Sequence, residues 1–137
     1  MAIDYGMKRS GIAITDELRL IASGLTALET KDLMSYLVSY LPAQQVDIIV
    51  VGDPKGLNGQ PTDASAGTDG FTRALQSRFP KIKVTRHSEM FTSKMASSAI
   101  AMSGLGKKKR QDKLLTDKVS AVIILQSYLE WMRHHPV

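Results

Sequence analysis

The first sixteen residues, MAIDYGMKRSGIAITD (residues 1–16), decide how the chain begins to fold. Residues 1–5 form a short run that is apolar except for Asp4 and ends at a glycine, and residues 8–16 alternate between apolar and polar side chains with the period of a β-strand. Residues 20–28 have a strand pattern as well and follow after a short connection. Because short connections join antiparallel neighbours, we expect the chain to open with three antiparallel strands.

Helix and strand patterns alternate after this opening. The run VDIIVV at residues 46–51 is compact and β-branched, which is typical of a buried parallel strand. The other expected elements are helices over residues 31–41, 62–79, 92–103 and 113–133 and a strand over residues 81–87. The order β-β-β-α-β-α-β-α-α predicts an α/β protein in which helices cover the faces of a mixed sheet.

Length and composition exclude several classes of protein. The 137 residues fit one domain, spanning residues 1–137, and 43% hydrophobic with 23% charged residues argue against wholesale disorder. The absence of cysteine excludes a disulfide framework, a thiol nucleophile and cysteine-ligated zinc or iron–sulfur sites. No apolar run reaches the length of a membrane span, and no signal peptide is visible, so we expect a soluble cytoplasmic protein.

Basic residues are concentrated in a few places and give the chain a net charge of +5. Residues 104–113 form a glycine-flanked basic loop without aromatic residues, which favours phosphate contacts over base stacking, although an ordinary solvated loop is the alternative. Lys55 lies in GDPKGLNG (residues 52–59), which lacks the spacing of a nucleotide-binding P-loop. The expected nucleic-acid-binding residues are Lys8, Arg9, Lys55, Lys107, Lys108, Lys109, Arg110 and Lys113.

Three acids stand out by position. Asp4 lies within an apolar strand, Glu89 follows a strand directly, and Asp117 occupies the first turns of the last helix. Each alone has a plain explanation: an acid satisfied by the Gly6 turn, an exposed glutamate, and a helix N-terminal acid favoured by the macrodipole. Together they fall at a strand, a strand end and a helix start of one sheet, and clustered carboxylates are ligands for hard cations such as Mg²⁺ or Mn²⁺. Such ions support phosphodiester cleavage.

Four segments carry a resemblance to a known family. They are AIDYGMKRSGIAITD (residues 2–16), IVVGDPKGLNG (49–59), SEMFTS (88–93) and DKVSAVIILQSYLE (117–130). The chain resembles the YqgF family, a Holliday-junction-resolvase-like group also described as pre-16S ribosomal RNA nucleases. The resemblance implies an RNase H-like fold with a five-stranded mixed sheet in the order 3-2-1-4-5. It also implies a divalent-metal nuclease site, with Asp4, Glu89 and Asp117 as catalytic residues and metal ligands.

The chain departs from the family pattern at one place, because Ser88-Glu89-Met90 stands where the family reads Asp-Glu-Arg. Three functions therefore stay open. The first is a Mg²⁺- or Mn²⁺-dependent endonuclease in ribosome biogenesis that processes the 5′ end of pre-16S ribosomal RNA. The second is a resolvase for branched DNA, which needs a two-fold dimer. The third is a nucleic-acid-binding module with weakened catalysis. We expect a nucleic-acid partner, no membrane, and a monomer or weak homodimer.

Overall fold

The computed structural model describes residues 1–53, 63–88 and 113–134, with side chains over residues 1–52, 66–87 and 118–133. Its strands are β1 (Ala2–Asp4), β2 (Arg9–Thr15), β3 (Ala22–Glu29), β4 (Ile48–Asp53) and β5 (Lys83–Ser88). Its helices are α1 (Leu33–Tyr40), α2 (Asp63–Arg78) and α5 (Lys113–His134), with 3-10 turns at Thr30–Asp32 and Leu41–Ala43 on either side of α1. The helix expected over residues 92–103 lies outside the described residues.

The strands form one five-stranded sheet in the order β3-β2-β1-β4-β5, which confirms the predicted order. β1 is antiparallel to β2 and parallel to β4, and β4 is parallel to β5. The carboxyl ends of β1, β4 and β5 therefore lie along one edge of the sheet. In sheets with parallel strands this edge is where binding sites form.

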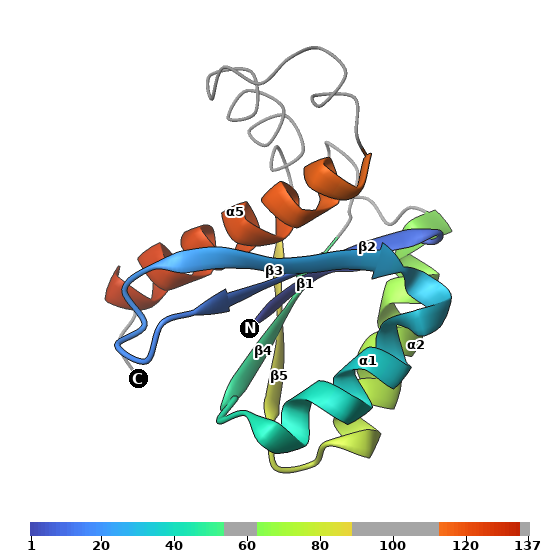
Figure 1. Cartoon of the computed structure of the whole chain (residues 1–137), viewed down its shortest axis with the longest axis horizontal. Coiled ribbons are helices and arrows are strands. Elements are labelled where there is room, and N and C mark those ends of the chain that lie inside the picture. The colour runs from blue at the N-terminus through green and yellow to red at the C-terminus, as the bar shows by residue number, and fades with distance from the viewer. Residues whose placement is uncertain (54–62, 89–112, 135–137) are drawn as a thin grey trace.

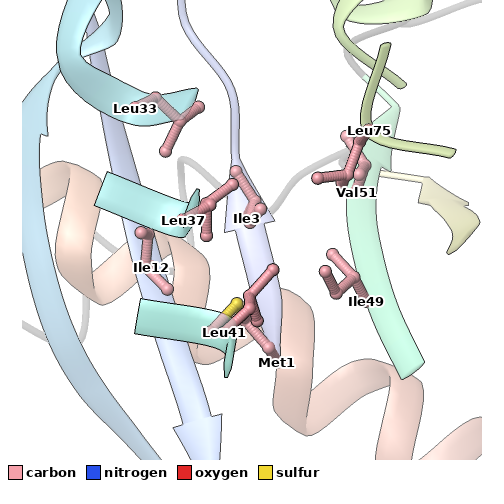
Figure 2. Close-up of a cluster of buried hydrophobic side chains, with 9 residues drawn as sticks. All are labelled: Met1, Ile3, Ile12, Leu33, Leu37, Leu41, Ile49, Val51 and Leu75. Atoms are coloured by element: carbon pink, nitrogen blue, oxygen red, sulfur yellow. The ribbon is translucent and has the colours of Figure 1, made fainter. Parts of the chain in front are cut away.

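Helices cover both faces of the sheet (Figure 1). On one face, Ile3 and Ile12 pack with side chains from α1 and α2, and Figure 2 shows this cluster. Its fully buried members include Ile3, Ile12, Leu33, Leu37, Ile49, Val51 and Leu75. Alternation along β1 and β2 turns Ala2 and Ala13 to the other face. There they pack with Ala121, Ile124 and Leu125 of α5. The small alanine side chains on both sides of this contact let the helix lie close to the strands.

Among the helices that the structure describes, none combines the length and the hydropathy that a bilayer crossing requires.

His87 joins β5 to α5. Its Nε2 atom lies 2.7 Å from the hydroxyl oxygen of Ser127, and its ring meets the ring of Tyr128 edge-on at 5.9 Å. Burial lowers the pKa of His87 below its usual value, because desolvation disfavours the charged imidazolium.

This lowered pKa predicts a loss of stability in acid. The unfolded chain binds a proton at His87 more readily than the folded one, so the free energy of unfolding falls as pH drops below about 6.5. Urea unfolding of wild type and of His87→Gln at pH 7.5 and 5.5 measures the effect. We expect wild type to lose more stability than the variant over this interval. Equal losses in the two proteins would contradict the assignment.

Candidate functional site

Asp4 ends β1 at the carboxyl edge of the sheet. Because Ala2 packs against α5, alternation places Asp4, two residues further along, on the same face. The residue is half-buried, and among the described residues its carboxylate makes no hydrogen bond or ion pair. A half-buried carboxylate without a cationic partner is costly, and a bound cation would offset that cost.

The neighbours of Asp4 across the sheet have very small side chains. Asp4 stands directly opposite Gly11 of β2, and Gly11 stands opposite Ala27 of β3. Neither residue has a side chain longer than a methyl group on this face. Gly11 is nevertheless buried, so these small side chains do not leave the sheet open at this point.

The structure says less about the other two expected acids, Asp117 and Glu89. Asp117 lies in the second turn of α5, the helix that packs on the face to which Asp4 belongs. The next residue, Lys118, approaches β3 so closely that a Cβ added to Gly24 would lie 2.7 Å from its Cγ. The side chain of Asp117 is not described, and Glu89, which follows the last residue of β5, lies outside the described residues.

No three acidic, histidine or cysteine side chains gather as a metal site within the described part of the chain. Of the three expected ligands, Asp4 alone has a described side chain. The meeting of the three carboxylates accordingly stays a prediction. The donor chemistry of Asp4 fits the expectation, since Mg²⁺ and Mn²⁺ prefer carboxylate oxygens.

Thr30 holds the turn that follows Asp4. Its backbone N–H donates to the carbonyl of Lys8 at 2.9 Å, and its hydroxyl donates to the carbonyl of Gly6 at 2.6 Å. The same hydroxyl lies 2.8 Å from that of Ser10, which is fully buried. A residue 24 positions further along the chain thus fixes the backbone between Asp4 and β2. Sequence reasoning missed Thr30, because a threonine after a strand has no distinctive local signal.

Lys8 and Arg9 emerge from this turn at the edge of a hollow of about 470 Å³. Its other lining residues are Met7, Glu29 and Lys31. Two of the expected phosphate-binding residues thus lie close to Asp4 in the chain and at the same edge of the sheet. Lys55, Lys107, Lys108, Lys109 and Arg110 lie outside the described residues, and Lys113 begins α5 without a described side chain.

A larger cavity of about 1000 Å³ lies at the opposite end of the sheet. It opens between the β2–β3 hairpin, the start of β4 and the C-terminal half of α5. Its charged lining side chains are Asp16, Glu17, Asp47 and Arg19, and because Arg19 pairs with Asp47, the balance of negative charge disfavours a polyanion. Size alone therefore does not identify the functional site, and the residues around Asp4 remain the better candidate.

Sequence comparison relates the chain to a family of nucleases. The family model described as "RuvX: Holliday junction resolvase" matches residues 1–131. A protein of Flavobacterium johnsoniae is 47% identical over 133 residues, covering 97% of this chain and 96% of its own. A protein of Bacteroides thetaiotaomicron is 44% identical over 133 residues, with the same coverage. Both relatives carry the name "Putative pre-16S rRNA nuclease".

Structural comparison agrees at the level of the fold. The crystal structure of the Fowlpox virus resolvase in complex with Holliday junction DNA matches with a TM-score of 0.56 and 15% sequence identity. The match covers 95% of each chain. The RNase H-like fold and the predicted strand order are thereby confirmed.

Proposed function

The chain belongs to the RuvX family, described as Holliday junction resolvases, and on that premise we propose that it is a divalent-metal-dependent endonuclease. The observation that carries this proposal is the half-buried Asp4 carboxylate, which has no cationic partner among the described residues and lies at the same edge of the sheet as a basic hollow. A negative site flanked by positive charge suits metal-assisted hydrolysis of a phosphodiester backbone.

We propose distinct roles for the acids and the basic residues. Asp4, Glu89 and Asp117 would hold one or two Mg²⁺ or Mn²⁺ ions, which when bound stabilise the charge that develops at the reacting phosphate and lower the pKa of water. Lys8 and Arg9 bind and orient the backbone beside Asp4. Lys55 and the basic residues within the segment 107–113 bind further phosphates of the same backbone.

Structured RNA is the substrate that we favour, at the 5′ end of the 16S ribosomal RNA precursor. Two relatives that match nearly the whole chain are named for that RNA. We propose that residues 1–137 act as one nuclease domain in the cytoplasm. Branched DNA is the second candidate, because the family model is described as a junction resolvase.

Cleavage assays with both substrates test the proposal. The purified protein is incubated with a labelled precursor fragment that spans the mature 5′ end, and separately with a four-way DNA junction, in Mg²⁺, Mn²⁺ or EDTA. We expect a discrete RNA product with either metal and none in EDTA. Cleavage of the junction alone would assign a resolvase. Binding without product under any metal would leave a non-catalytic module, as the Ser88 and Met90 departures allow.

A further inference from the structure

Glu29 is an acid within a basic surface. The hollow at the β1–β2 turn is lined by Lys8, Arg9 and Lys31, which are cationic, and by Glu29, its one carboxylate. The lining carries a net charge of +2, from three positive groups and one negative group. The net positive charge attracts a phosphate group, whereas the carboxylate of Glu29 repels it.

Glu29 and Lys31 already form an ion pair. The Lys31 Nζ atom lies 3.1 Å from Oε2 of Glu29, and the side chains are 76% and 62% exposed. The carboxylate raises the pKa of Lys31, so the lysine stays charged. Because exposed ion pairs contribute little to stability, the pair can open when a stronger anion arrives.

The hollow lies along the path to Asp4. Glu29 stands directly opposite Arg9 in the β2–β3 ladder. Two residues further along β2, a step of about 7 Å, Gly11 stands opposite Asp4. Alternation by two keeps these positions on one face of the sheet. A nucleic-acid backbone that reaches Asp4 from the β3 side therefore passes the hollow.

We propose that Lys31, together with Lys8 and Arg9, binds a phosphate of the substrate backbone, and that Glu29 occupies the place of this phosphate when no nucleic acid is bound. Glu29 thus competes with the substrate and lowers its affinity. The inference rests on the proposed function, in that it takes a nucleic acid as the ligand. It adds Lys31 as a binding residue and Glu29 as a residue that weakens binding.

Binding measurements without catalysis test this inference. Fluorescence anisotropy in EDTA, with the labelled precursor RNA fragment as the probe, gives Kd as a function of salt concentration. Lys31→Ala is compared with Lys81→Ala, which removes the same charge from an exposed lysine before β5, at the other end of the sheet. Glu29→Gln is compared with Glu130→Gln, which removes the same charge from an exposed glutamate of α5.

We expect Lys31→Ala to raise Kd and to reduce the salt slope by about 0.7–0.9, while Lys81→Ala leaves the slope unchanged. We expect Glu29→Gln to lower Kd by about two- to fivefold, more than Glu130→Gln does. If wild type binds but each variant matches its control, the subsite is wrong and the nuclease proposal stands. If Glu29→Gln raises Kd, the competition is wrong. If wild type does not bind nucleic acid, both proposals fail.

Discussion

Asp4→Asn is expected to reduce the rate of cleavage by at least about 10³-fold while the protein stays folded. The substitution replaces a carboxylate by an amide of nearly the same shape, so it removes the negative charge that would hold the metal. Since Asp4 makes no ion pair or hydrogen bond among the described residues, no stabilising contact there is lost with it. Single-turnover cleavage of the precursor fragment, with the melting temperature measured in parallel, gives both quantities.

Asp47→Asn is the matched control. Asp47 is an exposed aspartate that precedes β4 at the opposite end of the sheet and pairs with Arg19 at 2.5 Å. We expect its loss to leave cleavage within about twofold of wild type, because exposed pairs contribute only about 0–1 kcal/mol to stability. If Asp4→Asn cleaves as fast as Asp47→Asn, Asp4 does not hold a metal ion that the reaction needs.

Gly6→Ala is expected to destabilise the protein by about 1–3 kcal/mol. An added Cβ at Gly6 would lie 2.4 Å from the carbonyl oxygen of Arg9, which is backbone and cannot rotate away. The turn must shift, and the hydrogen bond from the Thr30 hydroxyl to the Gly6 carbonyl shifts with it. Urea unfolding measures the free energy, and we expect weaker nucleic-acid binding as well, because Lys8 and Arg9 leave this turn.

Gly70→Ala separates crowding from the general effect of an added methyl group. Gly70 lies in α2, and nothing stands within 4 Å of a Cβ built there. Alanine favours helix over glycine by about 0.5–1 kcal/mol, so this variant should be more stable than wild type. If Gly6→Ala also gained stability, the close approach of the Gly6 backbone to the Arg9 carbonyl would not require a glycine.

Strand and helix patterns predicted most elements to within a few residues, and the differences have local causes. The third strand begins at Ala22 rather than Leu20, because the Asp16 carboxylate accepts the backbone N–H groups of Leu20 and Ile21 and holds them in the hairpin turn. These N–H bonds also lower the pKa of Asp16. Leu20 and Ile21 are 61% and 64% exposed despite their apolar side chains. Apolar periodicity does not detect a turn that one side-chain oxygen closes.

The candidate site, too, could be predicted from the sequence only in part. That Asp4 shares the face of Ala2 follows from alternation in the sequence, and the packing of Ala2 against α5 identifies that face. The meeting of Asp4 with Glu89 and Asp117 stays a prediction. Lys31 and Glu29 were not expected to take part, because nothing within a few residues of either marks it as part of a basic hollow.

The sequence by itself determined most of the strands and helices, the fact that Asp4 shares a face of β1 with Ala2 and, through the motifs, the family of the chain. Register decided the rest. It set Arg9 opposite Glu29 and Gly11 opposite Asp4, and it placed Thr30 over the Gly6 turn. The physical reason is range: backbone preferences act over a few residues, whereas these contacts join positions 7 to 24 residues apart and exist only after the strands have paired.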